Sequence, residues 1–429
     1  MMPKSIPIPL PDGLNAELPR FVKVRQRFND EHIDDVDAAI AEQFKRFSSI
    51  EIQGKSIAIG VGSRGIRPQP PVVRAVVREL KARGGEPFIV PTMGSHGGGT
   101  AEGQAWILRD YGITEEYTGA PIRASMDVVT VGKLADGTPI YCDKLAYEAD
   151  YLIPCNRVKP HTDFRGKHES GLVKMLAIGM AKHVGAARIH LHGFEHFPEV
   201  LPAAAQVFID NTRMLFAIAM VENAYDQLKH VELVTADKLI ERDAALLEIA
   251  KANIPRLMFE SIDVLVVNQL GKDISGCGMD PNATGRPSTG LPGFETLPIR
   301  EIVVLDLTEA THGNATGLSN ADVTTRRLVE KMDWSATYVN IVTSGAIGGG
   351  KLPLVADTDN MALAIALRGV PRLVPQNARI VRVNNTLELA EVWVTEGMRE
   401  EVEANPDMEI IGDAFDARFD NEGALQAFA

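Results

Sequence analysis

The histidines of this 429-residue chain are unevenly distributed, since six of the ten lie between residues 161 and 196. Imidazole binds transition metals and changes its charge near neutral pH, so such a cluster indicates a metal site or acid–base chemistry. A polar surface run is the alternative. His190 and His192 are separated by one residue, so in an extended strand both rings would point to the same face. The six are His161, His168, His183, His190, His192 and His196.

A glycine-rich turn with a histidine at its centre follows a predicted strand at 88–91. Its sequence, residues 93–100, is Met-Gly-Ser-His-Gly-Gly-Gly-Thr, and a helix is expected from about Thr100. Glycines let the backbone approach a ligand, and a helix N-terminus favours an anion. We therefore expect Gly94, Ser95 and His96 to face a ligand, with an ordinary strand-to-helix turn as the alternative.

Two arginines follow another predicted strand, at 56–61. Arg64 and Arg67 lie in the sequence Arg-Gly-Ile-Arg-Pro-Gln-Pro. Guanidinium groups pair bidentately with carboxylates and phosphates, so an anionic substrate is predicted here; a solvated turn is the alternative. Gln269 and Lys272 follow a later strand, and Lys272 is a weaker candidate for a carboxylate anchor.

Strand-like and helix-like segments alternate along the chain, which favours an α/β fold with mostly parallel sheets. In the first half we predict strands at 56–61, 88–91, 151–154 and 215–221, and helices at 70–83, from 100, and at 236–252. In the second half we predict strands at 262–267, 302–307, 337–343 and 380–383, and helices at 323–332 and 360–367.

This pattern predicts two domains and a tail. Residues 1–258 are expected to form an N-terminal catalytic and cofactor-binding α/β domain, and residues 259–395 a smaller C-terminal α/β domain. Residues 396–429 are expected to pack as a tail on one of them. Ligands of such sheets bind beyond the carboxyl ends of the strands, so we expect the active site in a cleft between the two domains.

Composition excludes several classes of protein. Lys plus Arg number 44 and Asp plus Glu 57, so the net charge of −13 disfavours nucleic-acid and anionic-membrane partners. Three cysteines form no disulfide framework, which predicts a cytoplasmic protein. No secretory signal is recognisable, and the longest apolar run, 214–221, is too short to span a bilayer. The GxxxxGK match at 345–351 lacks the Ser or Thr of a P-loop.

Taken together, these stretches resemble the lactate racemase family over about residues 56–382. The Arg-Pro-Gln-Pro stretch at 67–70 is similar to the family's R-P-x-P sequence. Gly-Ser-His at 94–96 resembles the turn that carries one catalytic histidine, and Lys-Pro-His at 159–161 resembles the stretch that carries the second. The resemblance therefore implies that His96 and His161 are the catalytic pair.

The same resemblance implies a cofactor, the nickel-pincer nucleotide (nickel pyridinium-3,5-bisthiocarboxylic acid mononucleotide), and a dependence on the enzymes that synthesise it. Ser-Gly-Leu-Val-Lys at 170–174 is similar to the family's cofactor-binding S-G-G-x-K stretch, so Lys174 is expected to hold the cofactor covalently or by close polar contact. Gly94 and Ser95 are expected to contact it too. His190 stands at a separation similar to that of the nickel ligand, and His192 is its rival.

The chain's remaining matches and departures concern the substrate. Gln269 and Lys272 match the family's substrate-binding Q-x-x-K pair, and Arg67 matches its anchoring arginine. The acidic residue that precedes R-P-x-P in the family is Arg64 here, and the loop between the second histidine and the lysine is longer and more charged. These departures imply an anionic 2-hydroxy acid larger or more polar than lactate.

The expected chemistry is racemisation or 2-epimerisation by hydride transfer. Removing the Cα hydrogen as a proton would leave a carbanion beside a carboxylate, whereas no side chain accepts hydride and a cofactor can. One histidine would take the hydroxyl proton, and the second would serve the opposite stereoisomer. Two alternatives stay open: a zinc-type hydrolase built on the histidine cluster, and a non-catalytic member of the family that binds or stores the cofactor.

Overall fold

The computed structural model describes residues 5–62 and 65–426. The chain divides into two units, and each is built on its own sheet. Residues 29–254 form one unit, which we call the histidine unit because it contains the histidine cluster. Residues 1–28 and 255–429 form the other, which we call the terminal unit because it contains both ends of the chain.

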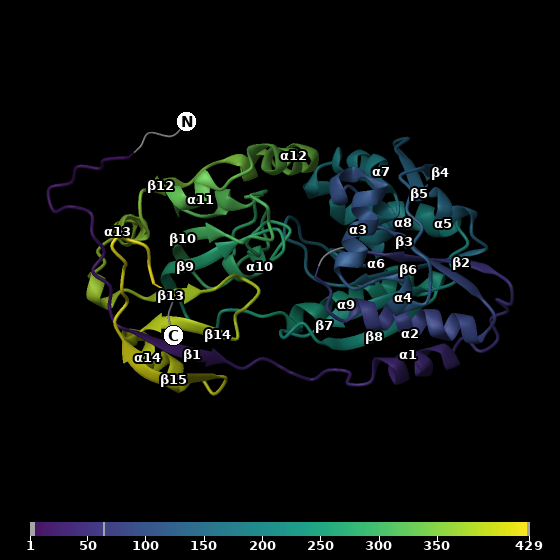
Figure 1. Ribbon diagram of the computed structural model, residues 1–429, viewed down its shortest axis with the longest axis horizontal. Coiled ribbons are helices and arrows are strands. Elements are labelled where there is room, and N and C mark those ends of the chain that lie inside the picture. Colours follow the sequence, from purple (N-terminus) through teal and green to yellow (C-terminus); the bar gives the residue numbers. More distant parts are fainter. Residues whose placement is uncertain (1–4, 63–64, 427–429) are drawn as a thin grey trace. The chain divides into compact units, whose positions relative to one another are not determined.

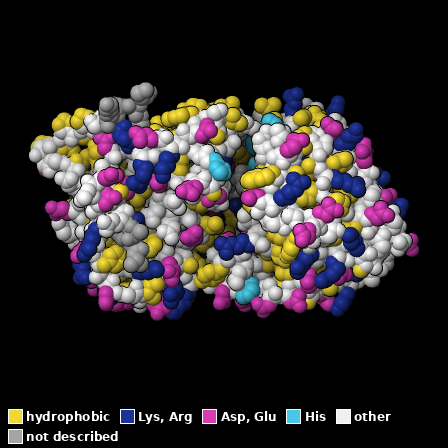
Figure 2. Space-filling view, viewed as in Figure 1, with side chains coloured by type: hydrophobic (Ala, Val, Ile, Leu, Met, Phe, Trp, Pro, Cys, Tyr) yellow, Lys and Arg dark blue, Asp and Glu magenta, His cyan; other side chains and the backbone are white. Residues whose placement is uncertain are grey.

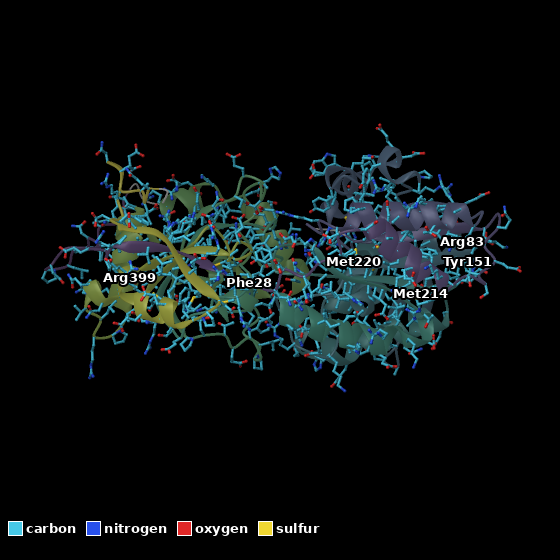
Figure 3. All side chains as sticks on the ribbon, turned by 90° about the horizontal axis from the view of Figure 1, so that it is seen from below. Phe28, Arg83, Tyr151, Met214, Met220 and Arg399 are labelled. Carbon is cyan, nitrogen blue, oxygen red and sulfur yellow. The ribbon has the colours of Figure 1, made fainter. Side chains whose placement is uncertain are left out.

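The sheet of the histidine unit has the strand order β3-β2-β6-β7-β8 (Figure 1). The first four strands are parallel, and β8 is antiparallel to β7. In Figure 3, Tyr151 marks the amino end of this sheet and Met220 lies toward its carboxyl end. The strands are β2 (Ser56–Val61), β3 (Glu86–Pro91), β6 (Tyr151–Arg157), β7 (Ala217–Glu222) and β8 (Leu228–Val234), beside a separate hairpin of β4 (Val128–Lys133) and β5 (Pro139–Asp143).

Helices of the histidine unit bury apolar stripes against this sheet. The helix α2 begins with prolines and buries Val73, Val76 and Leu80 at helical spacing, in the same core as Ile57 and Ile59 of β2. The helices are α1 (Val36–Lys45), α2 (Gln69–Ala82), α3 (Ala101–Asp110), α4 (Glu115–Thr118), α5 (Lys144–Glu148), α6 (Leu172–Lys174), α7 (Lys182–His190), α8 (Phe197–Asp210) and α9 (Leu239–Asn253), with a π-helical turn at Met175–Gly179.

The terminal unit is built on an eight-stranded sheet in the order β12-β11-β10-β9-β13-β14-β1-β15. The pairs from β12 to β13 are parallel, and the pairs from β13 to β15 are antiparallel. The strands are β1 (Phe21–Gln26), β9 (Ile262–Leu270), β10 (Ile299–Leu307), β11 (Val323–Thr325), β12 (Leu354–Ala356), β13 (Ile380–Val383), β14 (Glu391–Thr395) and β15 (Met408–Phe415).

The predicted fold class, α/β with mostly parallel sheets, is confirmed by both sheets. Two predictions of local structure in the terminal unit are wrong. The segment 337–343, predicted as a strand, lies inside the helix α12, and the helix predicted at 323–332 is the short strand β11 followed by α11. The helices of this unit are α10 (Pro281–Thr284), α11 (Arg326–Glu330), α12 (Trp334–Ser344), α13 (Asp359–Gly369) and α14 (Arg399–Ala404).

The unit boundaries also differ from those expected at 258 and 395. Residues 21–26 form β1, which pairs with β14 on one side and β15 on the other, so the first 28 residues belong with the C-terminal half of the chain. The expected tail contributes α14 and the strand β15 to the sheet. Residues 396–429 are therefore an integral part of the terminal unit rather than an appended tail.

The surface carries charges of both signs. Figure 2 shows Lys and Arg side chains interspersed with Asp and Glu over the visible face, and the described residues of that face form no broad basic patch. Within residues 5–62 and 65–426, no helix is long and apolar enough to cross a membrane.

The side chain of Gln26 ties β1 into the terminal unit. It is fully buried; its amide nitrogen donates to the carbonyls of Arg256 (3.1 Å) and Leu389 (2.6 Å), and its amide oxygen accepts from the backbone N–H of Met258 (2.7 Å). Gln26→Leu should lower the free energy of unfolding by roughly 2–4 kcal/mol, because it removes the three hydrogen bonds of a fully buried side chain and leaves the buried carbonyl of Leu389 without this donor. Urea unfolding followed by circular dichroism measures this. The matched change at exposed Gln376 should have almost no effect, and equal stability of the two variants would contradict the prediction.

Candidate functional site

Three neighbouring parallel strands deliver the predicted site residues to one edge of the histidine unit. Arg67 follows the carboxyl end of β2, His96 follows that of β3, and His161 follows that of β6. Parallel strands end at the same edge of a sheet, where ligands of α/β proteins bind. The strand β2 lies between β3 and β6, so the strands that lead to the two histidines are about 10 Å apart.

The structure brings His161 and Lys174 into direct contact. The Nζ atom of Lys174 lies 2.5 Å from Nε2 of His161. On the other side of the ring, the backbone N–H of Asp163 donates to Nδ1 (3.0 Å). Both ring nitrogens of His161 are therefore engaged, Nδ1 by the backbone and Nε2 by the lysine. The catalytic histidine and the cofactor lysine predicted from separate motifs thus form one pair.

A buried glutamate fixes the loop that carries His161. The side chain of Glu169 is fully buried, and its carboxylate accepts from the backbone N–H of His161 (2.8 Å). It also forms ion pairs with Arg165 (3.2 Å) and Lys251 (3.2 Å). The charged residues of this loop are expected from the sequence to contact the substrate. The contacts of Glu169, however, are to the loop itself and to Lys251.

A second buried carboxylate fixes the segment that carries Lys174. The Oδ1 atom of Asp243, from α9, accepts from the backbone N–H of Leu172 (2.6 Å) and of Val173 (3.4 Å) at the start of α6. Its Oδ2 atom lies 3.1 Å from Nδ1 of buried His168. A Cβ atom on Gly171 would lie 2.2 Å from Oδ1, so glycine is required for this approach. Asp243 thus holds the turn of helix that presents Lys174.

His190 lies close to this pair in an aromatic environment. The ring of Phe194 is 6.0 Å from the ring of His161 and 5.7 Å from that of His190, and Phe197 is 5.4 Å from His190. The Nδ1 atom of His190 donates to the carbonyl of Ala186 (2.7 Å), which leaves the Nε2 lone pair available.

The protonation state of His190 suits a metal ligand. Burial lowers the pKa of His190 below its ordinary value of 6.5, and the charge of Lys174 acts in the same direction. The hydrogen bond to Ala186 and the charge of Asp163 oppose this shift without cancelling it. The ring is therefore neutral at pH 7, which is the form that binds a metal, and its other nitrogen is already oriented by a carbonyl.

The rival His192 has a different environment, and the predicted shared strand is wrong. His190 is the last residue of the helix α7, and His192 lies in the turn after it. The Nε2 atom of His192 is 3.2 Å from Oγ1 of Thr138 and 3.7 Å from the carboxylate of Asp136, on the hairpin β4–β5. These two histidines therefore do not share a strand face.

The turn that carries His96 is built on glycines in the left-handed backbone region. Gly94, Gly97, Gly98 and Gly99 all have positive φ angles, which a residue with a side chain rarely adopts. The backbone N–H of Gly94 points to the carbonyl of Gly179 (3.3 Å), at the end of the π-helical turn. Ser95 and His96 are partly exposed.

The substrate residues predicted from the sequence are divided between the two units. Arg67 is largely exposed and forms an ion pair with Asp226 (3.6 Å), whereas Arg64 lies outside the described residues. Gln269 is exposed at the end of β9. The Nζ atom of Lys272 donates to the carbonyl of Gly276 (2.6 Å) in its own loop. Both Gln269 and Lys272 belong to the terminal unit, whereas Arg67 belongs to the histidine unit.

The donor set fits a metal held mainly by a cofactor. Within the part of the chain that the structure describes, no three His, Cys, Asp or Glu side chains are grouped closely enough to hold a metal ion. A bare zinc site built on the histidine cluster therefore has no donor set among these residues. One neutral, oriented imidazole beside a lysine fits a metal whose other ligands belong to an organic group.

Sequence reasoning missed the residues that orient this site. Asp243 is 69 residues beyond Lys174, and no local pattern connects them. The available signal was the position of Asp243 on the apolar face of α9, at helical spacing with Leu239, Leu246 and Leu247, because an acidic side chain is rarely buried without a partner.

At the sheet edge of an α/β unit, the structure therefore places together the predicted acid–base histidine, the predicted cofactor lysine and a neutral, oriented histidine. Residues 6–198 match the model of the lactate racemase N-terminal domain. This range contains every predicted site residue except Gln269 and Lys272. The resemblance seen in the motifs is therefore confirmed over residues 6–198, the part of the chain that carries most of the candidate site.

No protein of curated function matches the chain. Among solved structures, the lactate racemase apoprotein from Thermoanaerobacterium thermosaccharolyticum is similar, with 12% sequence identity and a TM-score of 0.49. The match covers 86% of this chain and 99% of that one.

Asp243→Ala should lower the free energy of unfolding of the histidine unit by roughly 2–4 kcal/mol, because it leaves two helix N–H groups and buried His168 without an acceptor. Asp243→Asn keeps one acceptor oxygen for Leu172 and should cost less. Urea unfolding compares the two with Asp237→Ala, an exposed control. Equal stability of Asp243→Ala and the control would show that Asp243 does not hold α6.

Proposed function

We propose that this protein is an isomerase, a racemase or 2-epimerase of an anionic 2-hydroxy acid, that works with the nickel-pincer nucleotide. The observation that carries the proposal is the contact between His161 and Lys174 beside a neutral His190, within the residues that match the lactate racemase N-terminal domain. An acid–base group, a cofactor lysine and a single metal ligand are what such a reaction requires.

In this proposal each residue of the site has a separate role. When bound, the nickel-pincer nucleotide supplies an electrophilic centre that accepts and returns hydride. Lys174 would hold the nucleotide's organic part and His190 its metal. Gly94 and Ser95, in the positive-φ turn, would contact it through the backbone.

His161 and His96 would move the hydroxyl proton of the substrate. Each ring follows its own strand, and β2 separates the two strands, so the rings can serve opposite stereoisomers of a substrate between them. His161 is buried, and its Nδ1 atom accepts from the backbone N–H of Asp163, so Nε2, which contacts Lys174, is the nitrogen that would exchange a proton with the substrate. An imidazole can act as either acid or base near neutral pH.

The substrate proposed is an anion larger or more polar than lactate. Arg67 and Lys272 are the expected carboxylate anchors, with Gln269 beside Lys272, and Arg64 adds a further positive charge to the same stretch as Arg67. The ion pair of Arg67 with Asp226 shows that a carboxylate of the protein reaches this guanidinium. A substrate with a second anionic or hydroxyl-rich group would use the additional charge of Arg64.

A mixed screen tests the proposal as a whole. The protein is produced together with the cofactor-synthesis enzymes, its nickel content and intact mass are measured, and D- and L-hydroxy acids are offered. Interconversion of malate, tartrate or sugar acids in preference to lactate supports it. Bound cofactor with no turnover of any hydroxy acid would favour the alternative, a cofactor-binding or storage protein.

His96→Ala and His161→Ala should each lower turnover by about 10²- to 10⁴-fold, the usual contribution of an acid–base group. The measurement is the initial rate of interconversion from each enantiomer separately, which also shows whether the two histidines serve different stereoisomers. His230→Ala, a half-exposed histidine of the same unit, is the control and should retain wild-type rates. Near-normal rates from both site variants would refute the assignment.

His190→Ala should lose bound nickel, and His192→Ala should keep it, because only His190 combines an oriented Nδ1 atom with a lowered pKa. Elemental analysis of protein purified from cells that make the cofactor gives the nickel stoichiometry of each variant. The reverse outcome, with nickel lost only from His192→Ala, would identify His192 as the ligand.

A further inference from the structure

One fully buried charge near the site belongs to a residue that no motif singled out. Lys182 is fully buried, and its φ angle of 53° is in the left-handed region. Lysine is almost never fully buried unless it is paired, and a side chain disfavours a left-handed backbone. Two such costs at one position indicate that the surrounding structure requires this residue here.

Three oxygen atoms surround the ammonium group of Lys182. Its Nζ atom donates to the carbonyl of Pro91, the last residue of β3. It lies 2.8 Å from Oδ2 of Asp143, a fully buried carboxylate, and 3.4 Å from Oε1 of Gln104. Pro91 and Gln104 accept hydrogen bonds from the ammonium group, and the carboxylate of Asp143 balances its charge at ion-pair distance.

Gln104 extends this contact to the turn that carries His96. The side chain of Gln104 is fully buried, and its amide nitrogen donates to the carbonyls of Gly94 (2.8 Å) and His96 (3.3 Å). Through Pro91 and Gln104, Lys182 therefore holds both ends of the segment from the close of β3 to His96.

Lys182 also stands midway along the segment that carries the other site residues. It is eight residues after Lys174 and eight before His190. Between Lys174 and Lys182 the chain forms the π-helical turn Met175–Gly179, and Met180 accepts from the backbone N–H of Asp143 (2.7 Å). A π-helical turn costs stability and is retained mostly at functional sites.

We propose that Lys182 is a positioning residue, which fixes the turn of His96 against the segment that carries Lys174 and His190. The buried triad of Lys182, Asp143 and Gln104 sets the location of one predicted catalytic histidine relative to the cofactor-holding residues. The structural part of this inference is independent of the proposed function; its catalytic consequence rests on that function.

Amide hydrogen exchange in the cofactor-free protein tests the structural part. Gln104→Leu keeps the ion pair but removes both donors to the turn, so peptides covering residues 92–100 should exchange about tenfold or more faster. The double variant Lys182→Met with Asp143→Asn removes both charges together, which avoids leaving a buried carboxylate unpaired, and should have the same effect. Lys238→Met, an exposed lysine of the same unit, is the control, and peptides of β9 are an internal reference.

Kinetics of the cofactor-loaded enzyme test the catalytic part. Both variants should lower kcat by about 10- to 100-fold with KM within about threefold, because a misplaced histidine affects the reaction more than binding. Wild-type exchange of residues 92–100 in a folded Gln104→Leu protein would overturn the proposal, and so would a faster exchange accompanied by unchanged kcat. A wild-type enzyme inactive on every hydroxy acid would instead refute the proposed function and leave the exchange result standing.

Discussion

The candidate site depends on the parallel pairing of β2 with β3 and with β6. Because the three strands run in the same direction, the loops that follow them emerge at one edge of the sheet, and residues nearly 100 positions apart in the sequence share one neighbourhood. Reversing any one strand would send its loop to the opposite edge. The buried apolar pattern of these strands is thus as important to the site as the histidines themselves.

The strands determine where these loops begin, and buried polar groups determine the conformation of the loops. Glu169 holds the backbone of His161, Asp243 holds the first turn of α6, and Lys182 holds the turn of His96. Each of them loses hydration on folding, and each recovers interaction energy through several short contacts with backbone atoms or opposite charges. A loop held in this way keeps a fixed conformation, which acid–base catalysis requires.

The features predicted correctly from the sequence are those that a local residue pattern determines. The strand β2 is a continuous apolar run, α2 has prolines at its start and an apolar stripe, and the two site histidines follow strands, so all of these were predictable. The segment 337–343 was not, because its β-branched residues favour a strand. Asp333 caps it as a helix at the start, Gly345 ends it with a positive φ angle, and Thr337 and Ile341, four residues apart, are its buried face. The strand β1 was not predicted, and its pairing was equally hidden, since nothing local in residues 21–26 indicates neighbours near residue 400.

The contrast between local sequence pattern and folded environment also explains why His190 suits a metal and His192 does not. The last turn of α7 directs the Nδ1 atom of His190 to the carbonyl of Ala186, and the rings of Phe194 and Phe197 pack against its imidazole. His192 lies beyond the helix, where a hydroxyl and an exposed carboxylate are its neighbours. A helical hydrogen-bond acceptor four residues upstream selects the tautomer, and apolar burial selects the neutral form. The choice of ligand therefore follows from where α7 ends rather than from the spacing of the histidines.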